Sequence, residues 1–312
     1  MKIGIPRAFL YYKYHVLWET FFEELGIEYI VSPKTNKELM REGTSLAIDE
    51  ACLPHKIYLG HVNYLVDKCD YIFVPRIATL GGTKDIVCSR FQAIYDLVKN
   101  TYREKDLKLL YYSIDILNKD TELKAFLKMG KFLGKNKAQV LKAYYIAKQA
   151  EKTTKLIELN EQRKNLESDK LKILVISHPY NIYDEYIGKP VLDTLKELDC
   201  VPILGCVVEN KKAREAAHSV SKTLPWTFNK ELVGAIALYQ DKVDGIILVS
   251  AFPCGPDSLV NEMIIRRLKD KPIITLILDA QEGTAGMETR LESFVDIIRI
   301  KEEREHEKEL QN

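Results

Sequence analysis

The chain has 312 residues, with 46 basic and 45 acidic side chains and a formal net charge of +1. This length exceeds one ordinary domain of roughly 100 to 200 residues. The charge balance excludes the broad basic surface that nucleic-acid binding needs, so no nucleic-acid partner is expected. No stretch approaches about 20 uninterrupted apolar residues, and the first residues lack the apolar run of a signal peptide. We therefore expect a cytoplasmic protein that does not engage a membrane.

The first hundred residues begin with the pattern of strand, helix and strand. Ile3 to Ile5 is a short apolar run, Leu17 to Leu25 carries apolar residues at helical spacing, and Tyr29 to Val31 is the next run. This order predicts a βαβ unit, in which two parallel strands are joined by a helix.

The composition changes between residues 102 and 169. Lys, Glu, Leu and Ala dominate this segment, Pro is absent, and Gly occurs only at positions 130 and 134. The segment therefore predicts two or three helices. The last of them is expected to be a long helix over Lys137 to Leu166 that crosses between domains.

The second half repeats the order of the first. An apolar run at 171–176, a helical stripe at 191–198 and a short run at 201–204 again predict a βαβ unit. Residues 67–74 recur at 241–248, and at the same offset Lys56 matches Lys230, Gly60 matches Gly234, and Cys52 falls opposite Trp226.

We therefore predict an α/β fold of two Rossmann-like parallel-sheet domains that are related by internal duplication and joined by a helical segment. The predicted boundaries are 1–101 for the N-terminal α/β domain, 102–170 for the helical connector and 171–312 for the C-terminal α/β domain.

The six cysteines fall into two groups. In a reducing cytosol they are not expected to form disulfides, and no CxxC pair occurs. Three of them lie beside apolar strand positions and are expected in the core: Cys69, Cys200 and Cys206. The other three lie in loop-like surroundings of Pro, Gly and charged residues: Cys52, Cys88 and Cys254.

Local sequence leaves the role of this second group open between core packing and metal ligation. Cys254 stands four residues after a predicted strand that ends at Ser250, and Cys88 follows one after a longer loop. Since ligands bind at the carboxyl ends of parallel strands, both could face one cleft. Pro54 and Pro256 suit the first turns of helices that would begin at Cys52 and Cys254, and a helix N-terminus favours the thiolate that binds metal.

Other ligands and nucleotide motifs receive less support. His55 and His61 are six residues apart, which does not place them on one helical face, while His178 follows a predicted strand and is expected to line the cleft or to pack in its loop. Neither a Walker A sequence nor a GxGxxG fingerprint is present, so nucleotide binding through those devices is not expected.

Several blocks in order resemble a known family. They are the opening IGIPRA, the segment DEACLP around Cys52, the stretch HPYNIYD from His178, the motif CGPDSL from Cys254, and TRLESF from Thr289. Together they are similar to the uncharacterised domain associated with CoA-substrate-specific enzyme activases, which resembles the subunits of 2-hydroxyacyl-CoA dehydratases and the double-cubane cluster proteins.

This resemblance implies two α/β domains and an iron-sulfur cluster, either [4Fe-4S] or the double-cubane [8Fe-9S] form, ligated by Cys52, Cys88 and Cys254. It also implies a separate actin-like ATPase, the activase, as the electron-donating partner. Cations such as Lys56, Arg76 and Arg90 would balance the negative charge of the cluster. Arg7 and Arg290 would serve likewise or form surface ion pairs.

The leading functional hypothesis is an iron-sulfur protein that accepts ATP-driven electrons and passes them on or reduces a small substrate. One alternative is a dehydratase-like lyase that removes water from a 2-hydroxyacyl-CoA. Another is a non-catalytic partner or scaffold for the ATPase. An acyl-CoA or other small substrate and a homodimer belong to these hypotheses, and whether the chain is an enzyme stays open.

One departure from the family pattern follows the last predicted strand. The family carries an acidic residue and a histidine there, whereas this chain reads Asp279-Ala280-Gln281-Glu282-Gly283. An altered activity is the expected consequence if that histidine takes part in the chemistry.

Overall fold

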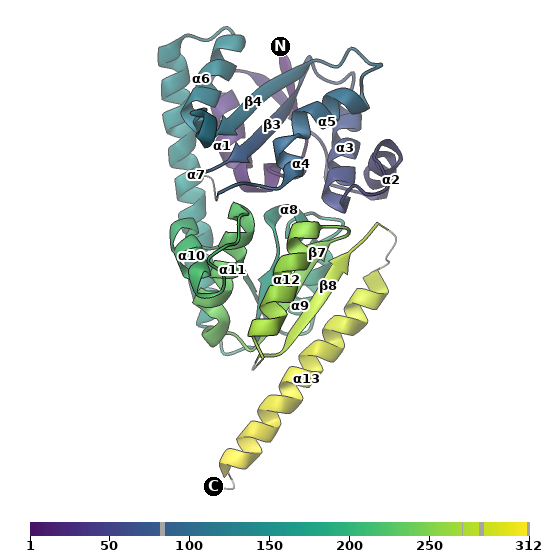
Figure 1. Ribbon diagram of the computed structural model, residues 1–312, viewed down its shortest axis with the longest axis vertical. Coiled ribbons are helices and arrows are strands. Elements are labelled where there is room, and N and C mark those ends of the chain that lie inside the picture. The colour runs from purple at the N-terminus through teal and green to yellow at the C-terminus, as the bar shows by residue number, and fades with distance from the viewer. Residues whose placement is uncertain (82–84, 270, 281–283, 311–312) are drawn as a thin grey trace. The chain divides into compact units, whose positions relative to one another are not determined.

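The computed structural model describes residues 1–81, 85–269, 271–280 and 284–310 (Figure 1). Contacts divide the chain into two compact units. Unit 1 comprises Met1–Glu158 and Thr223–Lys230, and unit 2 comprises Leu159–Lys222 and Glu231–Asn312. A short segment of the second half therefore returns to unit 1, which no sequence pattern indicated. The predicted division into two domains and a connector stays a prediction.

Unit 1 is built on a four-stranded, all-parallel sheet of order β2-β1-β3-β4. Its strands are β1 (Lys2–Ile5), β2 (Glu28–Val31), β3 (Tyr71–Thr79) and β4 (Leu109–Asp115). Its helices are α1 (Tyr11–Glu24), α2 (Lys37–Leu46), α3 (Leu53–Leu65), α4 (Ser89–Gln92), α5 (Ile94–Thr101) and α6 (Glu122–Phe132), with a 3-10 turn at Ile116–Asn118.

Strand β4 corrects the prediction that residues 102–169 are purely helical. Leu109 to Asp115 pair with β3 along its length. This stretch is rich in aromatic and branched side chains, and Leu110, Tyr112 and Ile114 are buried. The surrounding lysines and glutamates obscured that alternation. The two helices that follow, α6 and α7 (Lys137–Leu166), were predicted, and α7 has the predicted bounds.

Aromatic rings fill the core of unit 1. Trp18 on α1 lies edge-on to Phe73 on β3, with ring centroids 4.9 Å apart, and Phe21 lies 4.5 Å from Phe126 on α6. All four side chains are almost fully buried. Edge and tilted ring pairs add to the hydrophobic stabilisation that burial provides, so α1 and α6 are held on one face of the sheet.

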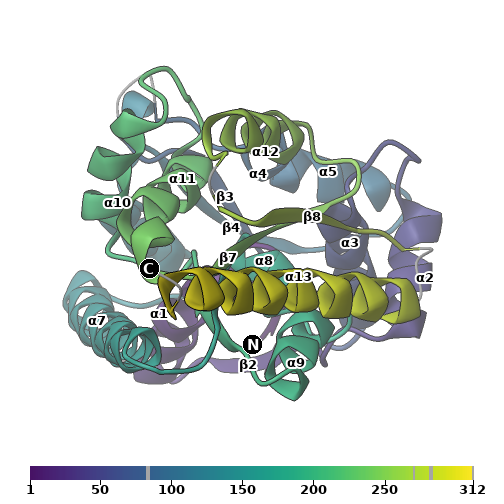
Figure 2. The same cartoon turned by 90° about the horizontal axis from the view of Figure 1, so that it is seen from below.

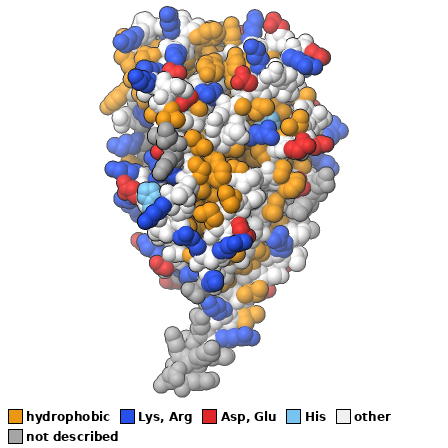
Figure 3. Space-filling model, in the orientation of Figure 1, with side chains coloured by type: hydrophobic (Ala, Val, Ile, Leu, Met, Phe, Trp, Pro, Cys, Tyr) orange, Lys and Arg blue, Asp and Glu red, His pale blue; other side chains and the backbone are white. Residues whose placement is uncertain are grey.

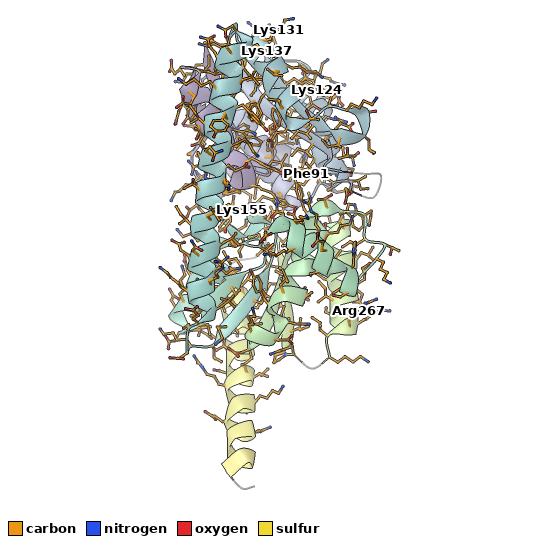
Figure 4. The ribbon with its side chains drawn as sticks, turned by 90° about the vertical axis from the view of Figure 1, so that its left-hand side faces the viewer. Phe91, Lys124, Lys131, Lys137, Lys155 and Arg267 are labelled. Atoms are coloured by element: carbon orange, nitrogen blue, oxygen red, sulfur yellow. The ribbon has the colours of Figure 1, made fainter. Side chains whose placement is uncertain are left out.

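Helix α7 begins in unit 1 and ends in unit 2, since the boundary falls between Glu158 and Leu159. Figure 4 shows Lys137 at its start and Lys155 further along. In unit 2 its last turns are fixed by Gln162, whose side chain accepts a hydrogen bond from the Leu204 amide at 2.8 Å and donates one to the Leu204 carbonyl at 3.0 Å.

Unit 2 has a second all-parallel sheet, of order β6-β5-β7-β8. The strands are β5 (Lys172–Ile176), β6 (Val201–Leu204), β7 (Gly245–Ala251) and β8 (Ile273–Leu278). The helices are α8 (Pro179–Ile182), α9 (Lys189–Glu197), α10 (Asn210–Ala216), α11 (Thr227–Tyr239), α12 (Gly255–Arg267) and α13 (Thr284–Leu310), with 3-10 turns at Ala217–Ser219 and Gln240–Lys242.

Helix α13 extends beside α9 on one side of this sheet, while α12 lies on the other (Figure 2). Its buried side chains Leu291, Phe294, Val295 and Ile298 recur at helical spacing. Phe294 and Ile298 lie so close to Gly245 that a Cβ there would meet them at 3.0 and 2.5 Å. This contact packs α13 against the start of β7.

The structure confirms the duplicated architecture. Both sheets have the same strand order, and α3 and α11 occupy positions that correspond at the predicted offset without a gap. The same steric constraint requires glycine at the matched positions 60 and 234. A Cβ on Gly60 would lie 2.0 Å from the Leu39 carbonyl oxygen, and one on Gly234 would lie 1.8 Å from that of Ala213. Each glycine therefore allows two helices to touch backbone to backbone.

Basic, acidic and hydrophobic side chains are interspersed over the face shown in Figure 3, in keeping with the balanced composition. Among the helices in the described part of the chain, none combines the length with the apolar character that crossing a bilayer would require.

Candidate functional site

In unit 1, Cys52 is the residue that precedes helix α3. Its backbone is extended, with φ −64° and ψ 150°, and Pro54 follows in the first helical turn as predicted. The Cys52 carbonyl accepts the amides of His55 at 2.9 Å and Lys56 at 3.2 Å, which closes that turn. The thiol is half-buried, so it is within reach of a bound group without being packed into the core.

Cys88 has the same relation to the short helix α4. It is half-buried, and its carbonyl accepts the amides of Phe91 at 3.0 Å and Gln92 at 3.3 Å. The residues just before it are held by the segment that returns from the second half. The Thr227 amide donates to the Ile86 carbonyl at 2.8 Å, and the Lys230 ammonium lies 2.8 Å from the Asp85 carboxylate.

The first turns of α3 and α4 meet around Phe9. The Phe9 ring lies 6.2 Å from His55 of α3 and 5.0 Å from Phe91 of α4, which Figure 4 labels. Burial, together with the positive charge of nearby Arg90, lowers the pKa of His55 from 6.5 to about 4. Unit 1 thus brings together the two helix starts that Cys52 and Cys88 precede.

Two buried polar atoms beside these helix starts have no hydrogen-bond partner within the described residues. They are Nδ1 of His55, a side chain that is 3% exposed, and the hydroxyl of Thr227, which is 0% exposed. Buried polar groups are rarely left unsatisfied in folded proteins. Such unsatisfied atoms are consistent with a site that a bound group or water completes.

In unit 2, Cys254 precedes helix α12, which follows strand β7. Asp257 in the first turn of α12 is paired with His178, whose Nε2 lies 3.0 Å from the carboxylate oxygen Oδ1. Both side chains are buried, and the His178 ring stacks on Tyr180 at 4.9 Å. Because β5 and β7 are parallel neighbours, His178 and Cys254 both follow carboxyl ends of adjacent strands.

A second set of buried polar atoms without a hydrogen-bond partner in the described residues lies on residues close to His178 in the chain. The Ser177 hydroxyl and both amide atoms of Asn181 are buried, and the described part of the chain offers none of them a hydrogen bond. The motif around His178 therefore forms a buried polar cluster in unit 2, and its role was left open by the sequence. The pairing with Asp257 could not be predicted, because 79 positions separate the two residues.

All six cysteines lie in the described part of the chain, and none is in a disulfide bond. Cys200 is buried, as predicted for a core thiol, and burial raises its pKa. Cys69 and Cys206 are half-buried rather than fully enclosed. Burial likewise raises the pKa of Cys69, whose Sγ donates to the Leu65 carbonyl at 3.4 Å.

The three predicted ligands are divided between the units, with Cys52 and Cys88 in unit 1 and Cys254 in unit 2. Among the described residues, no group of three or more His, Cys, Asp or Glu side chains is arranged to hold a metal ion. The donor chemistry fits an iron-sulfur cluster, which is held by cysteine thiolates. Ligation by this set stays a prediction.

The cations that would balance a cluster are mostly engaged within unit 1. Arg76 donates to the Gln92 carbonyl at 2.8 Å and to the Ser113 hydroxyl at 2.9 Å, and it lies 3.7 Å from Asp115. Lys56 donates to the Asp49 carbonyl at 3.1 Å. Arg76 therefore links the last residue of α4 to strand β4, while Arg90 is the cation that acts on His55.

Acid is expected to destabilise unit 1 through its buried histidines. His61 on α3 is fully buried, with Nδ1 2.8 Å from the Ser32 hydroxyl and Nε2 3.0 Å from the Thr35 hydroxyl. Burial, aided by the charge of Arg7, lowers its pKa from 6.5 to about 3. Below about pH 6.5 the unfolded chain binds a proton that the folded chain does not, so stability falls by about 1.4 kcal/mol per pH unit for each such group.

His55 adds a second contribution of the same sign, down to about pH 4. Urea unfolding at about pH 7.5 and about pH 5 measures the combined loss of stability. His61→Gln should make the decline shallower, while His218→Gln, at an exposed position, should keep it. An unchanged pH dependence in the His61 variant would contradict the assignment.

The two parallel-sheet units place the chain among doubly wound α/β proteins, whose sites lie at the carboxyl ends of their strands. The family described as the CoA enzyme activase uncharacterised domain matches residues 2–206, and the chain belongs to that family. The matched residues include Cys52, Cys88 and His178 but not Cys254. A search of curated proteins found no match.

Proposed function

We propose that the chain is an iron-sulfur protein of the 2-hydroxyacyl-CoA dehydratase and activase superfamily, which accepts low-potential electrons from a separate activase ATPase. One observation carries the proposal. Two helices that each begin directly after a cysteine, Cys52 or Cys88, start close together around Phe9, and both lie within the residues that match the family. Cysteine thiolates are the common protein ligands of such clusters.

In this proposal Cys52, Cys88 and Cys254 hold a [4Fe-4S] or double-cubane cluster through their thiolates. When bound, the cluster supplies one-electron transfer. The chain's own residues keep the site dry and orient the thiols, with Phe9 and Phe91 excluding water from the unit 1 helix starts and the His178 pair fixing the first turn of α12. Arg90 supplies positive charge beside the anionic group.

The test is strictly anaerobic purification, followed by iron and sulfide determination and electron paramagnetic resonance of the reduced protein. We expect about four irons per chain for a single cubane and about eight for the double form. Cys52→Ala, Cys88→Ala and Cys254→Ala should each lose most of the iron and the resonance. Cys200→Ala, which changes a buried thiol, is the matched control and should retain both.

Less than one iron per chain in the anaerobic wild-type protein would refute the proposal and favour a scaffold for the ATPase. If iron is present, reduction by an added activase with ATP, monitored by the same resonance, tests the electron-transfer role. Dehydration of a 2-hydroxyacyl-CoA in that mixture would instead identify the lyase.

A further inference from the structure

Unit 2 contains a cavity of about 340 Å³ at the carboxyl end of the edge strand β8. The end of that strand and Asp279 after it form one side, residues between Tyr186 and Pro190 that lead into α9 form another, and the first two turns of α13 form the third. The volume falls within the range of about 300 to 1,000 Å³ that is usual for small-molecule sites. None of the cysteines lines it, so it is distinct from the proposed cluster site.

The walls of this cavity are largely apolar. Ile187, Leu276 and Leu278 are buried, and Pro190 and Met287 are half-buried. Such side chains accept an aliphatic or aromatic group, because burial of apolar surface contributes about 25 cal/mol per Å². A small polar ligand such as a simple inorganic ion would leave these walls uncovered.

Two opposite charges line the same cavity without pairing. Asp279 follows β8, and Arg290 lies on α13. Within the described residues neither forms a salt bridge. Arg290 uses one N–H to donate to the Thr275 carbonyl at 2.6 Å, and Asp279 accepts the Ala280 amide at 2.6 Å. The guanidinium keeps further donors, and the carboxylate keeps further acceptors.

We propose that this cavity binds a free α-amino acid with an apolar side chain. The carboxylate of such a ligand pairs with Arg290, its ammonium group pairs with Asp279, and its side chain lies among the apolar walls. A simple fatty acid would bring its negative charge near Asp279, and an amine would bring its positive charge near Arg290. A zwitterion satisfies both groups at once, and charge-assisted hydrogen bonds are the stronger kind.

Isothermal titration of the full chain with L-leucine tests this proposal. We expect saturable binding of L-leucine and at least about tenfold weaker binding of 4-methylpentanoate, which lacks the ammonium group, and of L-leucine amide, which lacks the carboxylate. Absence of saturable heat at about 10 mM L-leucine would overturn the proposal. Equal binding of 4-methylpentanoate would overturn the role of Asp279.

Substitutions of the two charged residues test whether the ligand binds in this cavity. Arg290→Gln and Asp279→Asn should each raise the dissociation constant for L-leucine at least about tenfold. Arg266→Gln on α12 is the matched control, since Arg266 is exposed and pairs with Glu262 away from the cavity, and it should leave binding within about twofold. Binding that survives both cavity variants unchanged would place the amino acid elsewhere and refute the site.

Discussion

Replacement of Asp257 by Ala is expected to lower the free energy of unfolding by about 3 kcal/mol. The carboxylate is 5% exposed and lies 3.0 Å from Nε2 of His178, which is 4% exposed. Its removal leaves the imidazole buried without that partner, and the desolvation of that group is then not compensated. The link between the end of β5 and the first turn of α12 is lost at the same time.

Urea unfolding, with hydrogen exchange to locate the loss in unit 2, measures this effect. Asp257→Asn is the conservative comparison, because its amide oxygen still accepts a hydrogen bond, and it should recover more than half of the loss. Asp296→Asn, at an exposed ion pair with Arg299, should change stability by less than about 1 kcal/mol. Equal losses for the Ala and Asn variants at position 257 would rule out the hydrogen bond as the cause.

Insertion of a methyl group at either matched glycine is expected to cost about 3 kcal/mol or more. Gly60→Ala would place a Cβ 2.0 Å from the Leu39 carbonyl oxygen in unit 1, and Gly234→Ala would place one 1.8 Å from the Ala213 carbonyl oxygen in unit 2. In both cases the obstacle is backbone, which cannot rotate away as a side chain does. The two packed helices must separate.

Thermal and urea unfolding test these variants. Gly255→Ala is the matched control, because it lies at the start of α12 and a Cβ there would meet nothing within 4 Å. It should be neutral or slightly stabilising, since alanine restricts the unfolded chain. Wild-type stability of Gly60→Ala would show that α2 and α3 pack with more freedom than their backbone contact implies.

Hydrophobic periodicity was sufficient to predict the α/β class, the succession of strand, helix and strand that opens both halves, and the long helix α7. These features depend on local patterns, such as the buried runs at 171–176 and 245–248, and local patterns are visible in one sequence. Dependence on local patterns also explains why strand β4 was missed. Its seven residues lie within a lysine-rich segment, and the signal of a short strand is easily outweighed by the composition around it.

The candidate site was predictable only in part. Pro54 and Pro256 correctly indicated helices that begin after Cys52 and Cys254, because proline fits a first helical turn. The partnership of His178 with Asp257 depends on tertiary contacts between distant residues and leaves no local signal. Of the residues that depart from the family pattern, Ala280 follows strand β8 and its amide donates to the Asp279 carboxylate at 2.6 Å, while Gln281 lies outside the described residues.

Because Thr223–Lys230 belongs to unit 1, the two units cannot be produced separately by one truncation of the chain. A truncated chain that ends near residue 170 would keep every strand of the first sheet, yet it would lack the amide of Thr227 and the ammonium of Lys230 that hold the residues before Cys88. The two halves that arose by duplication are therefore no longer separable at a single cut. Expression of the N-terminal half alone would require residues 223–230 to be supplied as a peptide or fused through a linker.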